Sequence, residues 1–144
     1  MPSAVAAIWA AIDARLSALT LPGGYERMPS SDPDAYPALQ GFDEGERPIE
    51  SEPGSTRLAL GITIIGYVER QGGAAAHDEL VDLHASAVHA LCGDGTLGGL
   101  VEVIEISGAR RVDVAELASK RRLAFAQPFE IQFATVRGDP STFA

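Results

Sequence analysis

Apolar residues recur every three or four positions near the start of the chain, and this period predicts a helix. Such spacing places all of them along one side of the helix, where they can face a core. We expect the helix over residues 3–19, ended by the Pro22-Gly23-Gly24 turn. Its apolar side comprises Val5, Ile8, Trp9, Ile12, Leu16 and Leu19.

Alternation of apolar and polar residues predicts three strands farther along the chain. Residues 56–69, 100–107 and 121–137 show it, and each strand would turn one side toward a core and the other toward water. In the last strand Pro128 cannot donate a backbone hydrogen bond, so we expect a bulge or a bend at a sheet edge there. The core side of the first and last strands comprises Leu58, Leu60, Ile62, Ile64, Leu123, Phe125, Phe129, Ile131 and Phe133.

A second helix is expected over residues 75–92, after the Gln71-Gly72-Gly73 break. Before the first strand, residues 25–54 form an irregular acidic segment rich in Pro, Gly and Ser. Two interpretations stay open for this segment: one long functional loop, or a pair of short strands with an edge strand at Tyr36–Phe42. The apolar side of the second helix comprises Leu80, Leu83, Ala87, Val88 and Leu91.

These elements predict an α+β fold, in which a mostly antiparallel sheet packs against two α-helices. The 144 residues suit a single domain spanning 1–144, with its sheet and helix core over 56–137. We expect no signal peptide, because Asp13 and Arg15 interrupt the first apolar stretch and no basic leader precedes it, and no membrane-spanning helix, because no apolar run is long enough. Cys92 is the single cysteine, so a disulfide within the chain is excluded and the cytoplasm is the expected compartment.

Acidic residues dominate the chain, and their distribution is uneven. The formal net charge is −9, which disfavours a nucleic-acid binder that acts by neutralising phosphates. Before Ser107 there are 16 carboxylates against five arginines, whereas from Ser107 onward six cations face four carboxylates. The acidic part of one copy could attract the basic part of another copy. Alternatively, the charges only keep the surface solvated and the protein in solution.

The clearest motif is the run Gly93-Asp94-Gly95-Thr96-Leu97-Gly98, which matches the glycine spacing of a dinucleotide-binding turn. That turn must follow a strand and open a helix, so that the phosphate meets the helix N-terminus. Here the run follows the second helix and precedes a strand. We therefore interpret it as a helix end followed by a tight turn.

No set of residues predicts catalytic, cofactor or metal chemistry. His77, His84 and His89 are separated by seven and five positions, whereas ligands on one helical face need three or four. We expect His84 to be a hydrogen-bonded, partly buried residue, and Cys92, at a helix C-terminus, to be a small buried hydrophobe. The serines lie outside any acyl-transfer motif. An enzyme is not expected.

Two basic clusters, Arg110-Arg111 and Lys120-Arg121-Arg122, flank a short segment over residues 112–119. This segment could be a helical turn or an insertion at the sheet edge. Without interleaved aromatic residues, the clusters are a weak nucleic-acid signal. They are better candidates for ion pairs with an acidic surface of a partner, so the interface candidates are Arg110, Arg111, Lys120, Arg121 and Arg122.

Five short runs then follow one another in an informative order. They are Thr56-Arg57-Leu58-Ala59-Leu60-Gly61-Ile62, Ala90-Leu91, Asp94-Gly95-Thr96-Leu97-Gly98-Gly99-Leu100-Val101, Phe129-Glu130-Ile131-Gln132-Phe133-Ala134-Thr135 and Gly138-Asp139-Pro140. In this order they resemble the tail terminator, or minor tail, proteins of long-tailed bacteriophages and prophages. The resemblance extends from the first helix to Pro140, and the acidic stretch over residues 32–52 departs from it.

The resemblance implies a structural virion protein, made in the bacterial host cytoplasm, without enzymatic activity or cofactors. Its subunits would form a ring, expected to be a hexamer, on the head-proximal end of the tail tube. The ring would end tube polymerisation, contacting the tail-tube protein, and would present the surface that a head-completion or connector protein joins. The alternatives are a head-closure or neck connector protein of the same particle, and a small non-enzymatic binding domain.

A ring through which duplex DNA passes needs a lining that does not hold phosphates, and carboxylates would repel them. The expected protein therefore binds neither a specific DNA sequence nor a membrane. The acidic candidates for the channel are Asp43, Glu44, Glu46, Glu102 and Glu105.

Overall fold

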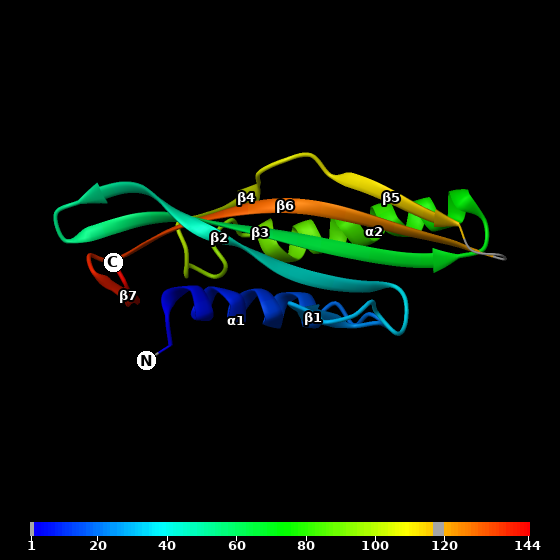
Figure 1. The fold of residues 1–144 in the computed structure, drawn as a ribbon, viewed down its shortest axis with the longest axis horizontal. Helices are drawn as coiled ribbons and strands as arrows, with labels where there is room; N and C mark the ends of the chain where they lie inside the picture. The colour runs from blue at the N-terminus through cyan, green and yellow to red at the C-terminus, as the bar shows by residue number, and fades with distance from the viewer. Residues whose placement is uncertain (1, 117–119) are drawn as a thin grey trace.

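The structure, a computed structural model, describes residues 2–116 and 120–144. Two helices and seven strands follow one another along the chain (Figure 1). Their bounds are α1 Ala4–Ser17, β1 Tyr25–Arg27, β2 Ala38–Glu52, β3 Ser55–Arg70, α2 Gly73–Cys92, β4 Val103–Ile106, β5 Arg111–Glu116, β6 Arg121–Val136 and β7 Asp139–Phe143.

All seven strands belong to one sheet, which confirms the expected α+β fold. The sheet runs in the order β1-β2-β3-β6-β4, and β5 and β7 also pair with β6. Every pairing is antiparallel except the short one between β1 and β2. The two 16-residue strands β3 and β6 pair along their full length and form the centre of the molecule (Figure 1).

Both helices pack into one core with the same side of β3 and β6. Register places Leu60 opposite Ile131 and Ile62 opposite Phe129, and all four side chains are buried. The predicted core side of both strands is thereby confirmed, as is the apolar side of each helix. The helices contribute Ala4, Ile8, Trp9, Ile12, Leu16, Ala76, Leu80, Leu83, Ala87 and Leu91 to this core. Within the described residues, the other side of the sheet carries no helix.

The prediction of a bulge or an edge bend at Pro128 is wrong. β6 is a central strand, and its register with β3 continues unbroken through the Thr63–Pro128 pair. The Pro128 carbonyl accepts from the Ser107 backbone, so the nitrogen of Pro128 faces the same side, where β4 has ended and β5 has not begun. A proline is tolerated there because no partner strand needs its missing N–H.

The irregular segment over residues 25–54 is mostly strand. β2 has 15 residues, whereas the sequence predicted either a loop or two short strands. The predicted edge strand at Tyr36–Phe42 covers only its beginning, and β1 pairs with it from Leu39 to Gly41 alone. The length of β2 comes from its antiparallel pairing with β3, with register shifts near Asp43 and Pro48.

The segment over residues 112–119 is not a helical turn in its described part. β5 pairs with β6 at the sheet edge, which agrees with the second interpretation, an insertion at that edge. Residues 117–119 of this prediction lie outside the described residues. β7 was not predicted; it folds back on the end of β6.

Candidate assembly surfaces

The acidic hairpin, defined as residues 43–58, extends beyond both helices at one end of the molecule (Figure 1). It consists of the second half of β2 and the start of β3. None of its side chains is buried. It carries five carboxylates and two arginines, so it is the most acidic projecting part of the fold.

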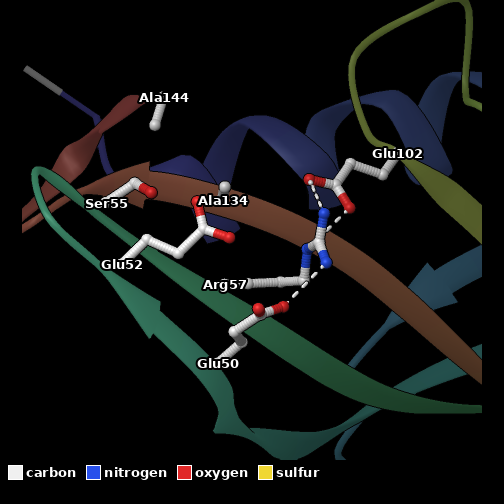
Figure 2. A pocket seen from close by; sticks show the side chains of 7 residues that line it. All are labelled: Glu50, Glu52, Ser55, Arg57, Glu102, Ala134 and Ala144. Atoms are coloured by element: carbon white, nitrogen blue, oxygen red, sulfur yellow. Dashed lines mark hydrogen bonds and ion pairs between the residues drawn. The ribbon is translucent and has the colours of Figure 1, made fainter.

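Both arginines of the acidic hairpin are already held by carboxylates. Arg57 lies between Glu50 and Glu102, at 3.0 Å from each (Figure 2). Arg47 pairs with Glu130 across the sheet at 3.0 Å. A hollow of about 210 Å³ beside Arg57 is lined by Glu50, Glu52 and Glu102. Within the described residues, the carboxylates of Glu44, Glu46 and Glu52 have no ion-pair partner.

A row of acidic residues crosses the side of the sheet that carries no helix. Gly61, Glu130 and Glu105 are direct cross-strand neighbours on β3, β6 and β4. The Cβ atom of Glu44 lies 3.5 Å from the position that a Cβ on Gly61 would take, so Glu44 continues the row. Carboxylates placed directly opposite one another on a sheet repel, and Arg47 compensates only one of them.

Asp43, a fourth acidic candidate, has a structural role. Its carboxylate accepts a hydrogen bond from the Trp9 indole at 3.2 Å and another from the Gly45 backbone at 2.7 Å. Gly45 has a φ of +87°, in the left-handed region that favours glycine. Asp43 therefore fixes α1 against the register shift in β2. Glu102, the fifth candidate, is held by Arg57.

The basic hairpin, defined as residues 110–116 and 120–122, lies toward the opposite end of the sheet from the turn of the acidic hairpin (Figure 1). Glu69 at the end of β3 is its anchor, with a side chain that is 9% exposed. Arg122 donates to Glu69 from both Nε and Nη2, at 3.0 and 2.9 Å. Lys120 also pairs with Glu69, and this hydrogen bond and that of Arg122 lower the pKa of the Glu69 carboxyl.

The sequence predicted Lys120 and Arg122 as interface cations, and the structure places both in ion pairs within the chain. The guanidinium of Arg122 also lies over the Tyr36 ring, 5.0 Å from its centroid. Sequence reasoning missed Glu69 and Tyr36, because only the register of β3 with β6 brings Glu69 opposite Arg122. Arg121 lies over Gly73 at the start of α2.

Arg110 and Arg111 differ from the other cations of the basic hairpin. Neither has an ion-pair partner in the described part of the chain. Arg111 is exposed, and Arg110 is half-buried with a guanidinium nitrogen, Nη1, that is buried without a hydrogen-bond partner among the described residues. Next to them on β5, Val112 and Val114 are 42% and 56% exposed.

The glycine-rich run after α2 is a tight turn, as expected, and it fixes α1 against α2. Asp94 accepts from the Gly98 and Thr96 backbones at 2.8 and 3.1 Å, and from Arg15 of α1 at 2.8 Å. The Arg15 hydrogen bond, followed by the two backbone hydrogen bonds, holds the pKa of the Asp94 carboxyl far below its usual range. These donors all come from the chain itself.

His84 and Cys92, two residues of α2 with reactive side chains, contact neighbouring parts of the fold. His84 is partly buried and hydrogen-bonded, as expected: its Nε2 lies 2.9 Å from the Gln127 side-chain oxygen. Cys92 is half-buried rather than fully buried, and burial raises the pKa of its thiol. The described residues contain no cluster of three or more candidate metal ligands. In the same residues, neither helix has the length and hydropathy that a membrane crossing requires.

Comparison with known proteins gives a likeness of fold. No family model matches the chain, and no curated protein sequence matches it. A second solved structure, at a TM-score of 0.42 and 14% identity over 88% of this chain and 94% of that chain, carries no argument. A chain in the structure of the virion of a native gene transfer agent (GTA) particle aligns with a TM-score of 0.56 and 15% identity. That alignment covers 85% of this chain and 92% of that chain, so the chain shares a fold, over most of its length, with a protein of a GTA virion.

Proposed function

We propose that the chain is a structural subunit of a phage-like virion and, within that particle, its tail terminator. In this role, copies of the chain form a ring, expected to be a hexamer, on the head-proximal end of the tail tube. The ring ends tube polymerisation and offers the surface to which a head-completion protein binds.

The observation that carries the proposal is the fold shared with a chain of a GTA virion, at a TM-score of 0.56. It agrees with the resemblance of the sequence runs to tail terminator proteins. The fold likeness rests on backbone geometry at 15% identity, whereas the resemblance rests on short runs of residues and their order.

The surfaces of the chain support assembly into a ring. A closed ring of identical subunits needs two different surfaces that meet head to tail. The acidic and basic hairpins lie at opposite ends of the sheet and have opposite charge (Figure 1). A single copy cannot bring its own two ends together, whereas neighbouring copies can.

Within this proposal, the helix-free side of the sheet faces the DNA channel. Glu44, Glu105 and Glu130 form the acidic row on that side, and phosphates of passing DNA would be repelled by it. Asp43, Glu102 and Glu130 are held by partners within the chain and contribute less to the repulsion than Glu44 and Glu105. A ring structure with a basic channel would overturn this part of the proposal.

The experiment that tests the terminator role is production of particles without this chain, followed by electron microscopy of their tails. We expect tubes of uncontrolled length, and supplying the wild-type chain in trans should restore uniform tails. Tubes of normal length that fail to join heads would contradict the terminator role and support the neck connector. Light scattering tests the ring: a strictly monomeric protein at every concentration and salt would count against it.

A further inference from the structure

The sheet edge formed by β5 and the end of β4 carries exposed apolar residues that the described part of the chain does not cover. Earlier on β4, the backbone N–H of Ile104 already donates to the Gly95 carbonyl at 2.9 Å. Ile106, Val112 and Val114 are 47%, 42% and 56% exposed. Register places them opposite Phe129, Phe125 and Leu123 of β6, so all three lie on the helix side of the sheet edge. Val81 of α2, on the same side of the sheet, is also 37% exposed. Exposed branched side chains gathered at a strand edge mark a surface that a partner covers.

Two arginines without ion-pair partners in the described residues lie beside these apolar side chains. Arg110 and Arg111 lie directly before Val112, and neither has an ion-pair partner among the described residues. Arg110 has in addition a buried guanidinium nitrogen without a hydrogen-bond acceptor there. The exposed guanidinium of Arg111, without an ion-pair partner among the described residues, remains available to a carboxylate of a partner.

The acidic hairpin offers the complementary surface. Its carboxylates Glu46 and Glu52 are exposed and have no ion-pair partner in the described part of the chain. Its β2 strand is also a free edge, because β1 covers β2 only from Leu39 to Gly41. The hairpin therefore presents both backbone hydrogen-bonding groups and negative charge.

Strand directions allow the two edges to join. β5 is antiparallel to β6, and β2 is parallel to β6 because each is antiparallel to β3. When neighbouring copies have the same orientation, β5 of one copy therefore lies antiparallel to β2 of the next. An added antiparallel strand is a common mode of recognition at a sheet edge.

We propose that the β4–β5 edge, with Arg110 and Arg111, binds the acidic hairpin of a second copy of this chain, and that the carboxylates of Glu46 and Glu52 attract the two arginines across the contact. The contact is head to tail, so each copy binds the next one, and the series ends when the last copy binds the first and closes a ring. It rests on the proposed ring and assigns the surfaces that meet in it.

The test is a charge swap between the two surfaces. Arg111→Glu makes both surfaces acidic, and the double substitution Glu46→Arg with Glu52→Arg makes both basic. Each protein alone should assemble more weakly than the wild type by about tenfold or more, because like charges then face each other. An equimolar mixture of the two should regain assembly, with both proteins alternating in the assembled species, because every contact is complementary again.

Mass photometry and light scattering measure the assemblies, and Arg111→Lys is the matched control. This substitution keeps the positive charge at the same exposed position, so it should leave assembly intact. If the wild type assembles and both charge-swapped proteins, each on its own, assemble equally well, this contact is wrong although the ring stands. Loss in both variants without recovery on mixing would also overturn it. Failure of the wild type to assemble would instead overturn the ring of the proposed function.

Discussion

The acidic and basic hairpins have opposite charge, and they use it differently. In the basic hairpin, Glu69 takes up Lys120 and Arg122, so much of its positive charge stabilises the fold. In the acidic hairpin, four of the five carboxylates have no ion-pair partner among the described residues, and of these four Asp43 accepts hydrogen bonds from Trp9 and Gly45. Charge that is paired within the chain supports the monomer, whereas unpaired charge remains available to a partner.

The difference also separates the cations within the basic hairpin. Arg122 and Lys120 belong to the monomer, whereas Arg110 and Arg111 lie at the free edge. The same substitution should therefore have different consequences in the two pairs. At Lys120 and Arg122 it should lower the folding stability, whereas at Arg110 and Arg111 it should weaken assembly.

The largest effect on stability is expected at the base of the basic hairpin, where Gln127 closes the gap between β4 and β5. Its side chain is 2% exposed and donates to the carbonyls of Gly108 and Pro128 at 2.8 and 3.0 Å, while its oxygen faces His84. Gln127→Ala should lower the free energy of unfolding by about 2–4 kcal/mol, because buried polar groups lose their partners and a cavity forms. Urea denaturation measures the change.

Gln132→Ala is the control for that substitution. Gln132 lies on the helix-free side of the same strand, where its amide donates a hydrogen bond to the Glu130 carboxylate at 3.3 Å, and its removal should cost well under half as much. Equal losses for the two variants would show that the gap between β4 and β5 is not a special point of the edge.

A smaller but clear loss of stability is expected from Arg122→Glu. The new carboxylate would face Glu69, whose side chain is 9% exposed, and the contact with the Tyr36 ring would be lost. Repulsion replaces two charge-assisted hydrogen bonds, so the Tm should fall by several degrees. Arg111→Glu, the same change at an exposed position of the same hairpin, should leave the Tm nearly unchanged. A similar Tm for both variants would contradict the division of the cations.

The pH dependence of stability provides a third test, again on the basic hairpin. The pKa of Glu69 is lowered from its ordinary value of 4.5 by the Lys120 and Arg122 hydrogen bonds. A lowered folded-state pKa gives stability that is present above the unfolded-state pKa and is lost as the pH falls through the folded-state value. In Glu69→Gln this acid-sensitive part is absent, so the stability difference from the wild type should shrink on acidification from about pH 6 to about pH 3.

Chemical denaturation at a series of pH values measures that difference. Glu52→Gln is the matched control in the acidic hairpin, since this exposed carboxylate has no ion-pair partner in the described residues. It should follow the wild type at every pH. A constant difference between Glu69→Gln and the wild type at all pH values would show that the ion pairs do not stabilise the fold.

Sequence patterns predicted those elements that bury one side. The 3–19 and 75–92 helices match α1 and α2 within two residues at each end, and the 56–69 and 121–137 strands match β3 and β6 within one. In each of them a core face imposes a regular period on the sequence. β4 is shorter than the predicted 100–107 strand, because residues 100–102 of that prediction belong to the turn after Asp94.

The pattern does not reveal β2, because its second half lies in the acidic hairpin, where no side chain is buried. Without a buried side there is no alternation, and pairing with β3 determines the strand instead. The assembly surfaces were found only in part for a similar reason. The basic cluster is visible in the sequence, but which cations remain unpaired depends on register, since Glu69 lies 53 positions before Arg122.

The smallest effect on stability, and the sharpest test of the comparison, is expected in the acidic hairpin. Glu46→Arg changes an exposed side chain without an ion-pair partner in the described residues, so the free energy of unfolding should stay within about 0.5 kcal/mol of the wild type. Removal of a carboxylate from a hairpin with a surplus of them relieves repulsion, so any change should be toward higher stability.

The value of Glu46→Arg lies in measuring folding and assembly on the same sample. Urea denaturation should show an unchanged monomer, while mass photometry should show weaker assembly. A destabilised monomer would mean that the acidic hairpin has charge partners of its own, and the two hairpins would then use their charge alike. A variant that matches the wild type in both measurements would mean that Glu46 lies outside the contact, which would leave Glu52 to account for the docking of the hairpin.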